Sequence, residues 1–134
     1  LSIYKLNKRE GLHMLNINTS TTDINSYTVT DIVMIKEAAL QHARDAGEAH
    51  LREHGEYAYC GFAWINIYDI KGNTKLGKRM KAAGIDKDYS GAYKIWNPSG
   101  LGTQCMSTKE AGAEAAARVF QAAGFKCYAG SRAD

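Results

Sequence analysis

The chain has 134 residues, a length that suits one domain built around one core. Its formal net charge of +3 falls to +1 without residues 1–13, which hold three of the 17 basic and one of the 14 acidic residues, leaving 14 and 13. A balance this close to neutral gives no strong case for nucleic acid binding. The three cysteines are widely spaced and no run approaches the roughly 18 apolar residues of a membrane span, so we expect a cytoplasmic protein with free thiols.

Residues 1–13 are basic and follow no clear period. Their last residue forms the pair His13-Met14 with the next one, and a cloning junction commonly leaves this pair. We interpret them as an expression remnant or a flexible arm, and a genuine N-terminal arm is the alternative. Residues 14–134 show no repeat and no linker, and are expected to form a single domain.

A long helix is predicted from about Asp31 to His54, with Thr30 as its N-cap and Gly55 as its end. The next stretch, from Tyr57 to Tyr68, is rich in both aromatic and β-branched residues. Alternation places Cys60, Phe62 and Trp64 on one side and Ala63, Ile65 and Ile67 on the other. Because both sides are apolar, the pattern predicts an inner strand covered on both faces.

Further elements follow at regular intervals. A short helix is expected from Lys75 to Ala83, a strand from Ala92 to Trp96 and a brief strand from Gln104 to Met106. Residues 86–91 and 97–103 have the composition of loops. We therefore predict an α+β fold, in which a small antiparallel or mixed sheet of three to four strands packs against the long N-terminal helix and an alanine-rich C-terminal helix.

The C-terminal helix carries the clearest local signals. Ser107 and Glu110 have the spacing of a capping box, which predicts the start of the helix. Gly124 predicts its end, with Phe125 packing back on Phe120. Its buried stripe is expected to consist of Ala116, Val119, Phe120 and Ala123. A final strand is predicted from Phe125 to Ala129.

Several motifs have an ordinary interpretation. His50-Leu51-Arg52-Glu53-His54 fits a zinc pattern, but it falls in a fraying last turn, where histidines favour the negative helix end. Gly100-Leu101-Gly102 lacks the third glycine of a dinucleotide fingerprint. Cys60 and Cys127 lie in apolar strand patterns and are expected to be buried. The basic residues between Lys71 and Lys87 suit a solvated face, or else a phosphate-binding one. No catalytic residue, metal site or cofactor is predicted.

The candidate binding residues lie around a strand-end aromatic ring and a polar loop, with arginines nearby. They are Trp96, Asn97, Ser99, Gln104, Arg118, Tyr128, Ser131 and Arg132. Such a set suits a stacked base and its phosphates. The alternative is that Trp96 belongs to the core and Arg132 to a frayed tail.

Segments 59–65, 95–100 and 131–134, together with Thr103-Gln104, resemble small proteins encoded by phages and prophages. Among these, the chain is most similar to the first family of anti-Thoeris proteins. The resemblance implies a non-enzymatic sponge that sequesters a cyclic ADP-ribose isomer or a cyclic oligonucleotide in the cytoplasm of an infected bacterium. It further implies that Trp96 stacks adenine, that Asn97 and Gln104 bond base or ribose, and that Arg118 and Arg132 pair with phosphates.

We expect a homodimer or a higher homo-oligomer, because the alanine-rich helix faces would supplement a small core. The alternative function is a phage inhibitor of a host protein or nucleic acid, of the anti-restriction or anti-CRISPR type, acting through the basic residues between Lys71 and Lys87. A small zinc or cysteine enzyme is a third alternative.

Overall fold

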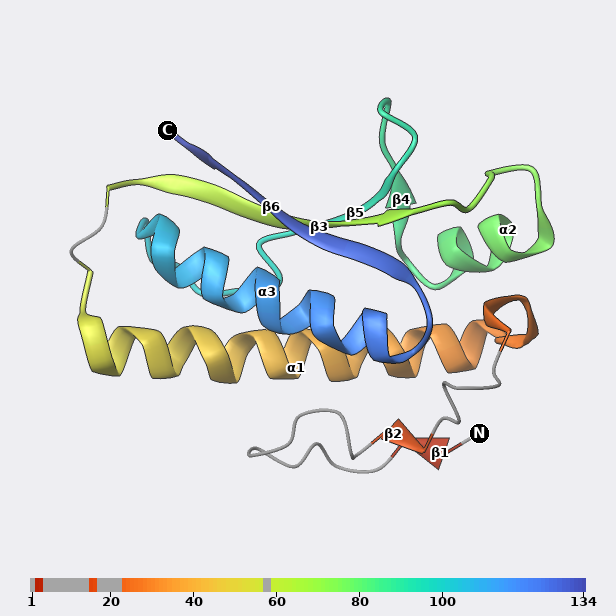
Figure 1. Ribbon diagram of the computed structural model, residues 1–134, viewed down its shortest axis with the longest axis horizontal. Helices are drawn as coiled ribbons and strands as arrows, with labels where there is room; N and C mark the ends of the chain where they lie inside the picture. Colours follow the sequence, from red (N-terminus) through yellow and green to blue (C-terminus); the bar gives the residue numbers. More distant parts are fainter. Residues whose placement is uncertain (1, 4–14, 17–22, 57–58) are drawn as a thin grey trace.

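The computed structural model of the protein describes residues 2–3, 15–16, 23–56 and 59–134. Their main elements are three α-helices and a four-stranded antiparallel sheet, which confirms the α+β class (Figure 1). The elements stack in layers: the sheet lies on α3, and α3 lies on the long helix α1 (Figure 1). A separate pair of short strands, β1 (Ser2–Ile3) and β2 (Leu15–Asn16), lies beyond α1. Most of residues 1–13, and Tyr57 and Ala58 of the predicted strand, lie outside the described residues.

Helix α1 (Val29–His54) is confirmed, apart from its N-cap. It follows a 3₁₀ turn, η1 (Ile24–Ser26), and the cap is Thr28 rather than Thr30. The Thr28 hydroxyl accepts from the Asp31 N–H at 3.1 Å, while the Asp31 carboxylate accepts from the Thr28 N–H at 2.9 Å. This reciprocal capping box satisfies two donors that a helix start leaves open, which explains why the helix begins two residues early. Gly55 ends it, as predicted, with a φ of 69°.

The sheet has the strand order β4-β5-β3-β6. Its strands are β3 (Gly61–Tyr68), β4 (Asp86–Lys87), β5 (Tyr93–Trp96) and β6 (Lys126–Ala133). Helix α2 (Lys75–Ala82) joins β3 to β4, and α3 (Met106–Ala122) joins β5 to β6, so the order is βαββαβ with split βαβ units. Strand β4 falls in a predicted loop, and β6 continues four residues past its predicted end.

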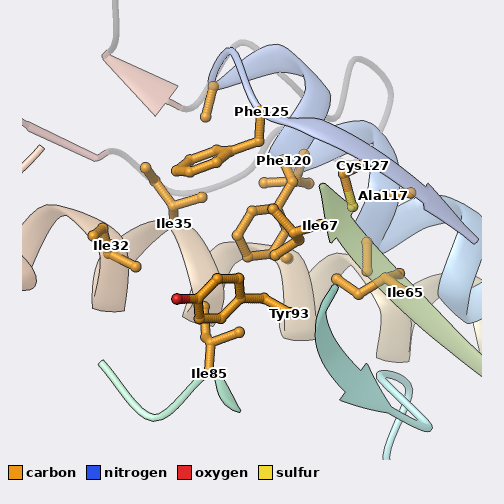
Figure 2. Close-up of a cluster of buried hydrophobic side chains, with 14 of the residues drawn as sticks. Ile32, Ile35, Ile65, Ile67, Ile85, Tyr93, Ala117, Phe120, Phe125 and Cys127 are labelled. Carbon is orange, nitrogen blue, oxygen red and sulfur yellow. The ribbon is translucent and has the colours of Figure 1, made fainter. Parts of the chain in front are cut away.

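Helix α3 is the centre of the core (Figure 2). Phe120 is fully buried and meets Phe125 edge-on, with ring centroids 5.6 Å apart. The Phe125 N–H donates to the Phe120 carbonyl at 3.0 Å, and Gly124 between them has a φ of 97°. The buried stripe and the C-terminal stop are therefore confirmed.

The start of α3 differs from the prediction. Cys105 is the N-cap and no side chain caps the helix there, so Ser107 lies inside the first turn. Glu110 accepts a hydrogen bond from Ser131 of β6 instead, at 2.6 Å. The brief strand expected from Gln104 to Met106 reduces to one bridge, between Cys60 and Cys105.

Strand β3 is an inner strand, but helices cover it on one side. Gly61, Ala63, Ile65 and Ile67 are buried on the helix side of the strand, whereas the residues between them are partly exposed. In the described part of the chain all three helices lie on the buried side (Figure 1). The predicted cover on both faces is therefore wrong, as is the predicted burial of Cys60, which is exposed.

Candidate functional site

Aromatic rings from three strands line the side of the sheet that the described helices leave open. We call it the aromatic sheet face and define it by Phe62, Trp64 and Tyr68 of β3, Trp96 of β5 and Tyr128 of β6. Strand pairing sets it up, because residues directly opposite one another in an antiparallel sheet share a face. Trp64 stands opposite Trp96 in this register. About half of Trp96 and of Tyr128 is exposed, 53% and 54%.

The rings form two contacting groups, one of Phe62, Trp64 and Trp96 and one of Tyr68 and Tyr128. Trp96 lies 4.9 Å from Trp64 and 6.4 Å from Phe62, centroid to centroid, and the Tyr68 and Tyr128 centroids are 6.2 Å apart. These separations are those of interacting aromatic pairs. Neighbours therefore hold each ring in place, while at Trp96 and Tyr128 about half of the side chain stays open to a ligand.

Gly130 of β6 makes room for the Trp64 indole. The two residues are directly paired across the sheet, and a Cβ at position 130 would lie 2.6 Å from the indole nitrogen. The indole therefore rests on the bare backbone of β6. Its N–H is buried and has no hydrogen-bond partner in the part of the chain that the structure describes.

Lys94 holds the two tryptophans from the β5 side. Its ammonium lies 5.0 Å from the Trp64 ring and 5.4 Å from the Trp96 ring, within reach of a cation–π interaction. The same ammonium lies 2.8 Å from the Asp88 carboxylate. Its hydrogen bond, with one from Ser90, lowers the pKa of Asp88 to about 2. Since Asp88 neutralises Lys94, this lysine positions the rings and is not a free cation.

The other end of the aromatic sheet face carries two cations beside Phe62. The Arg132 guanidinium carbon lies 5.6 Å from the centre of the Phe62 ring, and the Lys109 ammonium lies 5.3 Å from it. Arg132 stands opposite Phe62 in the β3–β6 register. Aromatic and positively charged groups thus meet at the start of β3.

Three of the eight predicted residues lie on this face: Trp96, Tyr128 and Arg132. Ser131 alternates to the helix-covered side, since it pairs with the buried Ala63. Gln104 lies in the loop before α3, where its carbonyl accepts from the Gly61 N–H at 3.3 Å. Its exposed side chain is therefore at the Phe62 end of β3.

Asn97 and Ser99 build the turn after β5. Asn97 has a φ of 43°, and its amide donates to the Leu101 carbonyl at 3.2 Å. The Ser99 hydroxyl donates to the Asn97 side chain at 3.2 Å. Ser99 is only 2% exposed, wedged where Gly47 of α1 and Gly112 of α3 come close. The structure gives Ser99 a place in the packing rather than at a ligand.

Arg118 is separated by the sheet from Trp96, Tyr128 and Arg132. It lies on the exposed side of α3, near His42 of α1, whose pKa is lowered by burial and by the Arg118 charge. A single cleft that joins Trp96 to both Arg118 and Arg132 is therefore not formed. The correction follows from the position of α3 beneath the sheet, while Trp96 projects above it.

The site residues that the sequence does not predict are Phe62, Trp64, Tyr68, Lys94 and Lys109. Phe62 and Trp64 were assigned to the core because they are apolar. The alternation of β3 and β5 was a usable signal, because it places the bulky rings on the same face of the sheet as Lys94. Lys109 gave no signal, because only the packing of α3 brings its ammonium to the sheet.

The histidine pair of the zinc-like motif has a different setting. The His50 ring nitrogen Nδ1 lies 2.9 Å from the Thr108 hydroxyl of α3, and the His54 ring lies 4.7 Å from the His50 ring. The described residues contain no group of three or more potential metal ligands. Within the same ranges, none of the helices has the length and apolar character needed to cross a bilayer.

The scan against protein-family models found none that matches the chain, and the searches of curated proteins and of solved structures found no match either.

Proposed function

We propose that the chain is a non-enzymatic binding protein that holds a phosphorylated nucleobase compound by stacking the base on the aromatic sheet face. The half-exposed Trp96 indole, held by Phe62, Trp64 and Lys94, is the observation that carries this proposal. A base stacked on an exposed aromatic side chain contributes about 1–3 kcal/mol. Aromatic residues on the open face of a small antiparallel sheet are a common way to bind unpaired bases.

The ligand we propose is a cyclic nucleotide immune signal, either a cyclic ADP-ribose isomer or a cyclic oligonucleotide. The resemblance to the first anti-Thoeris family supports this choice, and would make the chain a phage counter-defence protein acting in the cytoplasm of an infected bacterium. In that role Trp96 stacks the adenine and Arg132 pairs with a phosphate. A sponge needs affinity without turnover, and a homo-oligomer would bring several aromatic sheet faces together.

A second candidate ligand is single-stranded nucleic acid. The observation in its favour is the spread of the aromatic sheet face across three strands, from Phe62 to Tyr128, which offers room for more than one base. The basic residues between Lys71 and Lys87 follow the opposite end of β3 from Phe62, on and around α2 (Figure 1). They could guide a strand only if it extended beyond that end of the sheet.

The test is a ligand panel with matched variants. Cyclic ADP-ribose isomers, cyclic dinucleotides and a short oligothymidine are titrated by calorimetry, and the thermal midpoint is followed in parallel, since a ligand at 100 times its Kd adds about 2.7 kcal/mol. Trp96→Ala should weaken binding roughly 5- to 150-fold, which corresponds to the loss of one stacked base. Trp96→Phe should restore most of it.

Arg118→Gln is the matched control for Arg132→Gln, because Arg118 lies on the other side of the sheet. Tight binding of a cyclic nucleotide that is recovered intact after heat denaturation supports the sponge, whereas a cleaved product indicates a hydrolase. Binding of oligothymidine that weakens steeply with salt favours nucleic acid. If no member of the panel binds, or if Trp96→Ala binds as well as the wild type, the proposed function is wrong.

A further inference from the structure

Building on the proposed function, we propose that Lys109 and Arg132 form a phosphate-binding position beside Phe62. The ligand then lies across the start of β3, with its base on Trp96 and a phosphate between the two cations. The proposal sets the orientation of the bound ligand and gives the buried Lys109 a role in binding it.

Both cations lie within 6 Å of the Phe62 ring centre, Lys109 at 5.3 Å and Arg132 at 5.6 Å. The Phe62 ring contacts the Trp96 ring, at 6.4 Å between centroids. A group bound at Phe62 is therefore the direct neighbour of a base stacked on Trp96. In a nucleotide, the ribose separates base and phosphate by a comparable step.

Lys109 has an unusual environment. This lysine is only 8% exposed, although lysines are almost never this buried without a charged partner. Its ammonium donates to the Gly61 carbonyl at 3.0 Å, which uses one of its three donors. Among the described residues no carboxylate lies within ion-pair distance of it. A buried ammonium with spare donors is suited to an anion that arrives from outside.

The cations of this sheet face differ in whether a carboxylate pairs with them. Lys94 is paired with Asp88 at 2.8 Å, and Lys126, at the far end of β6, faces Asp69 at 3.5 Å. Arg132 has no such partner in the described ranges. The nearby Glu110 carboxylate accepts from Ser131, which points to the helix-covered side of β6. The uncompensated positive charge of this sheet face is therefore concentrated at Phe62.

The two cations have the chemistry that a phosphate needs. A guanidinium fork binds two oxygens of a phosphate at once, and an ammonium adds a compact point charge. Arg132 projects from the sheet edge and Lys109 from beneath it, so an anion at Phe62 would meet donors from two elements. Helix α3 thereby contributes to a site on the opposite side of the sheet.

The experiment compares adenosine with AMP, which differ by the phosphate alone. Binding is followed by tryptophan fluorescence and calorimetry on the full chain. The wild type should prefer AMP by about tenfold or more, the amount expected for charge-assisted hydrogen bonds. Arg132→Gln should remove most of this preference and leave adenosine binding within about twofold. Arg132→Lys should restore part of it.

Lys109→Met keeps the aliphatic stem but removes the second cation, so it should lower the preference for AMP over adenosine. The thermal midpoint checks that this variant folds. If this variant does not fold, the exposed Arg132 still decides the question. Arg118→Gln and Lys126→Gln are the controls, and both should keep the wild-type preference for AMP.

The two proposals fail in different ways. Equal binding of AMP and adenosine by the wild type, or an unchanged AMP preference in Arg132→Gln, would overturn the phosphate position and leave base stacking intact. Loss of adenosine binding in Trp96→Ala supports the stacking face independently. If the wild type binds neither compound, both the stacking face and the phosphate position are refuted.

Discussion

Gly130→Ala is the substitution that most directly probes the aromatic sheet face. The added Cβ would lie 2.6 Å from Nε1 and 2.8 Å from Cε2 of Trp64, where ordinary contacts begin at 3.4 Å. The indole must therefore retreat by about 0.8 Å (3.4 minus 2.6) or rotate off β6. Either movement disturbs its contacts with Trp96 and Lys94.

The expected cost is modest because the indole can move outward. Overpacking of this kind costs about 1–3 kcal/mol, and replacing a strand glycine by alanine returns roughly 0.5–1 kcal/mol. The difference is a net loss of about 0–2.5 kcal/mol, centred near 1 kcal/mol, and each kcal/mol should lower the thermal midpoint by about 4 °C in a domain of this size. The near-ultraviolet circular dichroism of the tryptophans should change as well.

The assay is thermal unfolding of the variant beside Gly102→Ala, where an added Cβ would meet nothing within 4 Å. The control should stay within about 0.5 kcal/mol of the wild type. If Gly130→Ala is as stable as the wild type and gives the same near-ultraviolet spectrum, the indole does not rest on β6 and the described aromatic sheet face is wrong.

Three other outcomes follow from the structure. Phe120→Ala should lower the free energy of unfolding by about 3–5 kcal/mol in denaturant titrations, because it empties the centre of the core, and a loss below 1 kcal/mol would contradict that burial. The pKa of Asp88 is lowered from 3.8 to about 2, so its hydrogen bond with Lys94 stabilises the fold above pH 3.8 and is lost as the pH falls through about 2. The stability advantage of the wild type over Asp88→Asn should therefore be present at neutral pH and vanish near pH 2, and a constant difference would be inconsistent with it. A thiol reagent should label the exposed Cys60 in the native protein, whereas Cys127, whose pKa burial raises to about 12, should react only after unfolding, and labelling of both in one native phase would contradict the packing.

Local signals predicted much of the fold. Gly55 and Gly124 end their helices as expected, because glycine adopts without strain a positive φ that stops a helix. The start of α3 could not be predicted in the same way. Glu110 has the spacing of a capping box, but Ser131, 21 residues away, engages it instead. A distant partner thus decided which of two local arrangements formed.

The end of β6 shows the same limit. Gly130-Ser131-Arg132-Ala133 has little strand propensity and lies beyond the predicted end of the last strand, yet it pairs with β3 along its whole length. Tertiary pairing overrides weak propensity in such segments. Strand β4 is a two-residue case of the same effect, held by β5.

The candidate site was predicted in part. Trp96, Tyr128 and Arg132 lie on one face of the sheet, while Arg118 lies on the exposed side of α3, which packs against the other face. Phe62 was assigned to the core because apolar character reports what a side chain can bury and not whether anything covers it. Only the arrangement of all the helices on one side of the sheet answers that question.

Because the described helices cover the sheet on one side, alternate residues of β3 have different roles. Ala63, Ile65 and Ile67 pack in the core, whereas the residues between them face away from it. Along β3, tolerance to substitution should therefore alternate from one codon to the next in a library selected for folding alone. Under the proposed function, exchange of the rings at positions 62 and 64 would change which ligand binds without rebuilding the scaffold underneath.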